Sequence, residues 1–144
     1  MRVLVQRVKH ASVKVDDKIV GQIKQGLLVL VGVTHEDNKN NADFLAKKVC
    51  NLRIFRDEED KMNLSVKDVK GELLIISQFT LYGDANKGNR PSFIEAAKPE
   101  EANELYEYFC EKCNEEVKVH KGIFGADMKV ELLNDGPVTI MIEK

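Results

Sequence analysis

The stretch GLLVLVGV, from Gly26 to Val33, decides the fold because it contains no polar side chain. A strand with one face in water alternates apolar and polar residues, whereas a strand covered on both faces reads as an unbroken apolar run. We therefore expect residues 26–33 to form a central strand with protein on both sides. This is also the longest uncharged apolar run in the chain, and it is far too short to span a membrane.

Further strands are predicted on either side of this run. Val3 and Val5 alternate with other residues in the way that is typical of half-buried strands, and polar residues at 16–18 are expected to turn the chain. Residues 83–92 are rich in Gly and Asn and are predicted to form a loop. The predicted strands besides 26–33 are residues 2–9, 11–16, 51–55, 72–81, 129–133 and 138–142.

Two helices are predicted from apolar residues at helical spacing. The first is capped by Asp37 or Asn38 and runs to about Leu52, and the second begins at Pro99, since proline is favoured at the first helical position. The second helix cannot cover two sheet faces. The predicted fold class is therefore α/β, with a mixed, largely antiparallel two-sheet β core and helices packed on one side, in three α/β/β layers. We expect residues 1–144 to form a single domain.

Composition excludes several classes of protein. With 43% hydrophobic and 32% charged residues, the chain is expected to be an ordinary globular protein rather than a disordered one. A net charge of −2 leaves any contact with nucleic acid to a local patch. The charged N-terminal stretch MRVLVQRVKH leaves no room for a signal-peptide core, and three cysteines, an odd number, fit a reducing compartment. A cytoplasmic location without a membrane segment is predicted.

Familiar catalytic motifs are absent. The chain has no Gly-x-x-x-x-Gly-Lys phosphate loop, no Gly-x-Gly-x-x-Gly and no Gly-x-Ser-x-Gly elbow, and its three histidines lie far apart. Cys110 and Cys113 form a Cys-x-x-Cys pair without the second pair, or the histidines, of a zinc site. We interpret them as buried structural cysteines and expect no metal. A thiol-redox or metal role for this pair is the alternative.

The stretch SQFTLYGD, from Ser77 to Asp84, places polar residues at the end of a buried strand, where functional sites often lie. Main-chain amides at Phe79 and Thr80 are then free to donate to a developing oxyanion. The Thr80 hydroxyl is available as a nucleophile or as an orienting donor. On the alternative interpretation, Gln78 and Thr80 are the solvent-facing half of an alternating strand.

The stretch Asn134-Asp135-Gly136-Pro137 contains a contradiction. Asp-Gly between two apolar runs predicts a two-residue hairpin turn. The proline opposes that turn, because it biases Gly136 toward extended backbone and cannot donate to the sheet ladder. Taken alone, these four residues indicate an ordinary trans proline in an edge turn.

Together, SQFTLYGD at 77–84 and NDGPVT at 134–139 resemble the paired signatures of the D-aminoacyl-tRNA deacylases, also called D-tyrosyl-tRNA deacylases. The resemblance covers nearly the whole chain, including the stretches MRVLVQRV, GLLVLVGV, GNRPSF and GIFGADM. It implies a cofactor-free, homodimeric esterase for chiral proofreading in translation. Such an enzyme hydrolyses the ester of D-aminoacyl-tRNA and releases the free D-amino acid and tRNA. Because glycine has no side chain to exclude, we expect mischarged glycyl-tRNA to be a substrate too.

The resemblance also implies how chirality is read. The Gly136–Pro137 peptide is expected to be cis and to enter the active site of the partner subunit, with Arg7 bracing the loop that carries it. An L substrate would place its side chain where the D isomer has only hydrogen, against a rigid main-chain wall. Side-chain pockets discriminate far less, at about 1–3 kcal/mol per methylene.

The remaining implied roles concern the ester and the adenosine. Phe124 and Met128 are expected to line the pocket for the terminal adenosine. An aminoacyl ester is already activated, so positioning and an oxyanion hole can supply much of the acceleration without a triad, and we favour attack by water assisted by the RNA's own 2′-hydroxyl. The alternative function is a non-enzymatic dimeric binding module. The residues implied to hold the ester carbonyl are Ser77, Gln78, Phe79 and Thr80.

Overall fold

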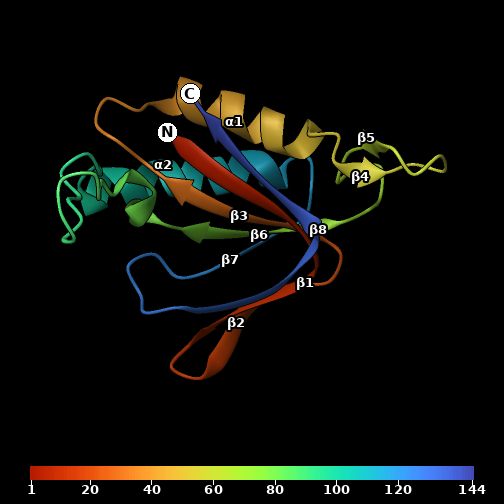
Figure 1. Ribbon diagram of the computed structural model, residues 1–144, viewed down its shortest axis with the longest axis horizontal. Coiled ribbons are helices and arrows are strands. Elements are labelled where there is room, and N and C mark those ends of the chain that lie inside the picture. Colours follow the sequence, from red (N-terminus) through yellow and green to blue (C-terminus); the bar gives the residue numbers. More distant parts are fainter.

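The computed structural model describes all residues from 1 to 144. Figure 1 shows the two long helices on one side of the strands. None of the helices has the length and hydropathy needed to cross a bilayer. In chain order the elements are β1 (Arg2–Val15), β2 (Lys18–Ile23), β3 (Gly26–Gly32), α1 (Lys39–Asn51), β4 (Phe55–Arg56), β5 (Met62–Leu64), β6 (Glu72–Ser77), the 3-10 helix η1 (Phe79–Tyr82), α2 (Pro99–Asn114), β7 (Val119–Lys121) and β8 (Lys129–Glu143).

Strand β3 is the central, doubly covered strand that its apolar run predicts. It pairs antiparallel with β1 and parallel with β6. Leu27 and Val29 face a core shared with the helices, whereas Leu28 faces a second core on the opposite side of the strand. Because both faces of β3 are buried, every position of the run is free to be apolar, which confirms the prediction.

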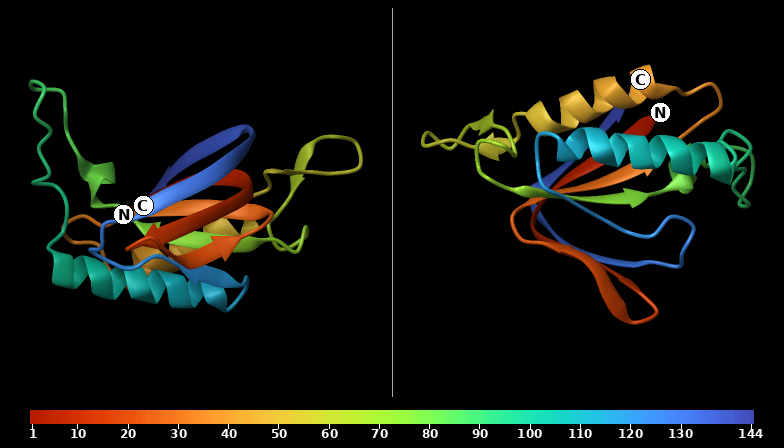
Figure 2. Two further views of the ribbon diagram at one scale, coloured as in Figure 1. Left: turned by 90° about the horizontal axis from the view of Figure 1, so that it is seen from below. Right: turned by 180° about the vertical axis from the view of Figure 1, so that it is seen from behind.

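The sheet folds over itself at the middle of β1. Strand β1 pairs with β3 along residues 2–8 and with β2 along residues 11–15, while β8 follows it on the other edge through both halves. The bend gives two strand layers, which Figure 1 and the right-hand view of Figure 2 show beneath the helices. The second core, which includes Val13 and Ile76, fills the space between them. The predicted mixed, largely antiparallel core with helices on one side is confirmed.

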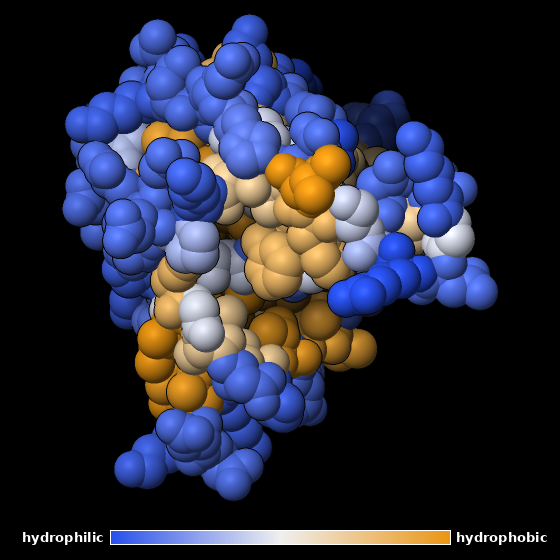
Figure 3. Space-filling view, turned by 90° about the vertical axis from the view of Figure 1, so that its left-hand side faces the viewer, coloured by the Kyte–Doolittle hydropathy of each residue, from blue (hydrophilic) through white to orange (hydrophobic).

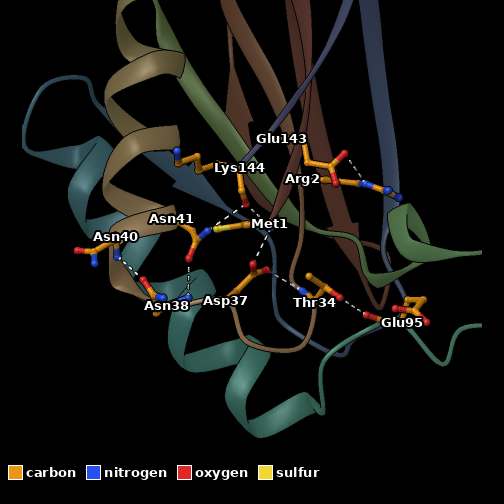
Figure 4. Close-up of polar contacts among 10 residues, drawn as sticks. All are labelled: Met1, Arg2, Thr34, Asp37, Asn38, Asn40, Asn41, Glu95, Glu143 and Lys144. Atoms are coloured by element: carbon orange, nitrogen blue, oxygen red, sulfur yellow. Dashed lines mark hydrogen bonds and ion pairs between the residues drawn. The ribbon is translucent and has the colours of Figure 1, made fainter.

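Of the two caps predicted for α1, the structure uses Asn38. Its side-chain oxygen accepts a hydrogen bond of 2.9 Å from the amide of Asn40. The carboxylate of Asp37 is engaged elsewhere, because it accepts from the amino group of Met1 and from the amide of Thr34, both at 2.7 Å. The amino group of Met1 also donates to the carbonyl of Lys144 at 2.8 Å. Figure 4 shows how these contacts join β1, β8 and the start of α1.

Several predicted strand boundaries are wrong. The strands predicted at 2–9 and 11–16 are one continuous strand, β1, because β8 pairs with it on both sides of His10. Only the last residue of the predicted strand 51–55 is in a strand, since the last turn of α1 occupies Asn51. The turn predicted at 16–18 is present, with positive φ at Asp16 and Asp17. Strands β2, β5 and β7 are not among the predicted ones.

The strand predicted at 72–81 ends at Ser77 and is followed by the 3-10 helix η1. The amide of Gln78 still donates to the carbonyl of Val31 on β3, at 2.7 Å. The following acceptor on that edge, the carbonyl of Val33, is occupied by the amide of Ala97 at 2.9 Å. Because no free acceptor on β3 follows, the chain turns away from the sheet after Gln78. The alternative interpretation, in which Gln78 and Thr80 are the solvent-facing half of a strand, is therefore wrong.

The hairpin predicted at residues 134–137 is also wrong. Both halves of β8 pair antiparallel with β1, so the chain does not reverse direction there. Gln6 of β1 pairs with Thr139 of β8, and Val8 pairs with Asn134. Between these two pairs β1 advances by two residues, whereas β8 advances by five. The surplus residues bulge out of the strand, and we call residues 134–139 the Gly-Pro loop. Its Gly136–Pro137 peptide is cis, as the resemblance implies.

Candidate functional site

A cavity of about 630 Å³ opens where β3 and β6 end and α2 begins. The carboxyl ends of parallel strands are a common location for ligand sites. Most of the residues around the cavity are apolar, and Figure 3 shows the hollowed apolar surface surrounded by hydrophilic side chains. Five of the residues proposed from the sequence line it, namely Ser77, Gln78, Phe79, Phe124 and Met128.

Helix η1 supplies the polar edge of this cavity. It begins at Phe79, so the amides of Phe79 and Thr80 have no acceptor within the helix. The side-chain amide of Gln78 donates a hydrogen bond to the hydroxyl oxygen of Thr80. That oxygen is therefore an acceptor toward Gln78, and its own proton remains available to donate to a neighbouring group. Thr80 is exposed beside the cavity but does not line it.

Residues 93–97 form another part of the cavity wall, beside η1, and this segment is held against the end of β3. The hydroxyl of Thr34 donates to the carbonyl of Glu95, and a ring nitrogen of His35 lies 2.7 Å from the carbonyl of Ile94. The rings of Phe93, in this segment, and Phe79 pack in a T-shaped arrangement, with centroids 5.2 Å apart at 71°. Both rings are more than one-third exposed, so they form an apolar rim around the opening.

Phe124 and Met128 form the side of the cavity contributed by the loop before β8. Met128 packs against the core between the strand layers, and the ring of Phe124 lies 6.0 Å from that of Tyr106 on α2. The Tyr106 hydroxyl donates to the carbonyl of Ile75 at 2.8 Å, and burial raises the pKa of this tyrosine well above its ordinary value. Tyr106 therefore forms a neutral, rigid base to the cavity.

The Gly-Pro loop forms a separate cluster around Arg7, whose side chain is buried. Its Nε donates to the carbonyl of Asp135 at 3.0 Å, and its Nη1 donates to the carbonyl of Ile54 at 2.7 Å. The Asp135 carboxylate lies 3.6 Å from the same Nε. Gly136 and Pro137 themselves are exposed.

In a single chain these two clusters lie apart. Arg7 stands opposite Leu27 at the start of β3, whereas the cavity begins at Val31, four residues further along the strand. At roughly 3.3 Å per residue, this separates them by about 13 Å along the sheet. Neither Arg7 nor the exposed pair Gly136 and Pro137 lines the cavity of its own chain.

Few titratable groups face the cavity. No histidine lines it, and its only carboxylate, that of Asp127, is largely exposed and lies 3.0 Å from the ammonium of Lys129. No group of three or more His, Cys, Asp or Glu residues is arranged to hold a metal ion. Cys110 and Cys113 are buried in α2, and burial raises the pKa of the Cys110 thiol to about 12. A thiol held protonated is poorly suited to redox chemistry or metal binding.

Most of the other residues around the cavity were not proposed from the sequence, among them Phe93, Lys98 and Tyr106. Apolar residues at helical spacing predict the second helix, and Tyr106 is a buried residue of that helix, but such spacing gives no sign that a residue also borders a cavity. Phe93 and Lys98 come from the irregular segment before that helix, where periodicity carries no signal.

Comparisons with known proteins find similar sequences and structures along nearly the whole chain. The family model described as D-Tyr-tRNA(Tyr) deacylase matches residues 4–143. A D-aminoacyl-tRNA deacylase of Fusobacterium nucleatum is 62% identical over 144 residues, covering 99% of this chain and 95% of the relative. A solved structure titled c-Myc DNA Unwinding Element Binding Protein is 40% identical, with a TM-score of 0.94 over 100% of this chain and 99% of the other.

A second solved structure shows that the fold persists at low identity. It is titled as a structural analysis of a probable eukaryotic D-amino acid tRNA deacylase, and it is 18% identical to this chain. Its TM-score is 0.85, over 99% of this chain and 98% of the other.

Proposed function

The chain belongs to the D-Tyr-tRNA(Tyr) deacylase family, and we propose that it hydrolyses the ester between a D-amino acid and the 3′-terminal ribose of tRNA. The enzyme releases the free D-amino acid and tRNA, and so removes wrongly charged tRNA before translation. Its partner is aminoacyl-tRNA, which it meets in the cytoplasm. The observation that carries this function is the pair of unpaired amides at Phe79 and Thr80, on the edge of an apolar cavity.

The chemistry follows from that edge. The amides of Phe79 and Thr80 hold the ester carbonyl and stabilise the negative charge that develops on its oxygen. Ser77 and Gln78 complete the polar edge of the cavity. The hydrogen bond from Gln78 holds the Thr80 hydroxyl in place, and this hydroxyl donates to the bound ester. No histidine lines the cavity, and its only carboxylate, that of Asp127, is paired with Lys129, so water activated by the 2′-hydroxyl of the ribose is the nucleophile.

Selection against L esters needs a second chain. We place Gly136 and Pro137 of the partner subunit over the cavity, where their main chain occupies the space that an L side chain would need. Two observations support this dimer: the pair is exposed in its own chain, and β8 has no partner besides β1, which leaves its outer edge free. Phe124 and Met128 bind the terminal adenosine in this arrangement.

The test of this function compares D-tyrosyl-tRNA, L-tyrosyl-tRNA and glycyl-tRNA as substrates for the purified protein with metals chelated. We expect the D ester to be hydrolysed about 100-fold faster than the L ester, because a rigid main-chain wall excludes an L side chain more completely than a side-chain pocket does. Glycyl-tRNA should also be hydrolysed, since glycine has no side chain to exclude. Release of amino acid from neither tyrosyl ester would contradict the function.

Replacing Thr80 tests the nucleophile. We expect Thr80→Ala to lower kcat by less than about tenfold, because removing a true nucleophile costs about 10⁴-fold or more. The measurement is single-turnover hydrolysis of D-tyrosyl-tRNA, with thermal unfolding to verify the fold. Thr80→Ser is the matched control, since it keeps the hydroxyl. Near-complete loss in the alanine variant, with the fold intact and activity kept in the serine variant, would count against water as the sole nucleophile.

A second candidate is a dimeric module that binds nucleic acid without hydrolysing it. The observation in its favour is the 40% identical structure, whose title names a DNA-binding protein. The two functions differ in the same assay, because a binding module retains charged tRNA and releases no amino acid.

A further inference from the structure

Residues Asp84–Ser92, which we call the 84–92 loop, project from the rim of the cavity and have no role in the chemistry described above. Figure 2 shows this loop standing away from the rest of the chain in its left-hand view. It leaves η1 at Gly83 and returns at Phe93, so both of its ends adjoin rings that form the cavity rim. Anything that leaves the cavity by this side passes the loop.

The base of the loop is held by main-chain hydrogen bonds. The amide of Asp84 donates to the carbonyl of Ser92, and the amide of Ser92 donates to the carbonyl of Asp84, both at 2.8 Å. The Asp84 carboxylate accepts from the amide and the side chain of Asn86, at 2.9 and 2.7 Å. These bonds shape the loop without help from its cations, so the charged side chains are not needed to fold it.

The tip carries two cations, Lys87 and Arg90, that are exposed and form no ion pair. Lys98, which lines the cavity, also lacks an acidic partner. The one carboxylate within the loop, that of Asp84, is occupied by Asn86. In a chain of net charge −2, Lys87 and Arg90 make the tip of this loop locally positive.

The proposed substrate supplies the opposite charge at this position. A cavity of about 630 Å³ suits an aminoacyl ester and one nucleoside, so the nucleotides that precede the terminal adenosine lie outside it. Each of them carries a phosphate. Resting on the function proposed above, we infer that the 84–92 loop binds the single-stranded 3′ end of tRNA, with Lys87 and Arg90 contacting its phosphates.

The experiment uses two D-tyrosyl esters, one of full-length tRNA and one of adenosine, which has no phosphate. For the double variant Lys87→Ala/Arg90→Ala, we expect KM for the tRNA ester to rise about tenfold with kcat unchanged. Hydrolysis of the adenosine ester should not change. The slope of log KM against log salt concentration should fall by about 1.4, since each single-strand phosphate contact contributes about 0.7.

The matched control is Lys24→Ala/Lys70→Ala, which removes two exposed, unpaired lysines at the other end of the β3–β6 pair. We expect it to leave all three measurements unchanged. An unaltered KM in the loop variant, an equal effect on both esters, an equal effect of the control, or a changed oligomeric mass would overturn the inference. Failure of the unsubstituted protein to hydrolyse either ester would instead sink the proposed function.

Discussion

Hydrolysis of D-tyrosyl-tRNA is expected to fall about 100-fold or more when Gly136 is replaced by alanine, because misplacing a positioning group by about 1 Å can cost that much. The backbone at Gly136 has φ of +133°, a conformation that side chains rarely tolerate. An added Cβ would lie 2.9 Å from a methyl of Val138 and 3.0 Å from Nη2 of Arg7. Arg7 cannot withdraw, since its Nη1 is bonded to the carbonyl of Ile54. The Gly-Pro loop must therefore move.

The measurements are kcat/KM for D- and L-tyrosyl-tRNA, and molar mass by light scattering. The enzyme interpretation predicts lost activity or lost selectivity in an intact dimer. A binding module with a loop that merely seals an interface predicts the reverse, namely a weakened dimer with hydrolysis unaffected.

A mixing experiment tests whether the loop acts across subunits. Ala126 lines the cavity, so Ala126→Phe should block the cavity while leaving the Gly-Pro loop intact. If each cavity uses its partner's loop, the heterodimer of Gly136→Ala and Ala126→Phe contains one complete site. Subunits mixed and exchanged at random should recover about a quarter of the unsubstituted activity. No recovery despite verified exchange would mean that each loop serves its own chain.

The sequence predicts those elements well whose position depends on the residues of the element itself. The unbroken run at 26–33 places β3 at the centre of the fold, because only burial on both faces tolerates such a run. Pro99 likewise starts α2 at the predicted residue. Both follow from the residues themselves, whatever the rest of the chain does.

The errors occur where a distant segment decides the local structure. Asp135-Gly136 is a sound hairpin signal, but β1 is long enough to pair with both halves of β8, and that pairing prevents reversal. Thr80 fits an alternating strand until Ala97 takes the carbonyl that would continue the ladder. Such competition is not visible in a window of ten residues.

The candidate site divides in the same way. The strand end at Ser77 marks the polar edge of the cavity, because a buried run that ends in polar residues is readable from sequence. The apolar rim at Phe93 depends on contacts of the segment before α2 with Thr34 and His35. These contacts join residues about 60 positions apart, so no spacing rule finds them.

Replacing Arg7 is expected to have the second large effect, on stability as well as on activity. Arg7→Ala should lower the free energy of unfolding by about 3 kcal/mol, because it leaves the carbonyls of Asp135 and Ile54 without their charged donor and removes a buried side chain. The Gly-Pro loop then loses its fixed contact with the strands. We expect kcat/KM for the D ester to fall about 100-fold even at temperatures where the variant is folded. Urea unfolding and single-turnover kinetics check the two effects separately.

Lys9, which is paired with the carboxylate of Asp135 as Arg7 is, provides a matched control for Arg7. Lys9 also lies 3.6 Å from Asp135 Oδ2, but its side chain is exposed, so Lys9→Ala should cost less than about 1 kcal/mol and leave hydrolysis unchanged. Arg7→Lys keeps the charge yet lacks a planar group that reaches two diverging carbonyls, so it should resemble the alanine variant more than the native protein. If Arg7→Lys were fully active, charge near Asp135 would be sufficient and the bracing of the loop by two directed hydrogen bonds would be unnecessary. If Lys9→Ala were as damaging as Arg7→Ala, the ion pair with Asp135 would matter more than the contacts of Arg7 with the main chain.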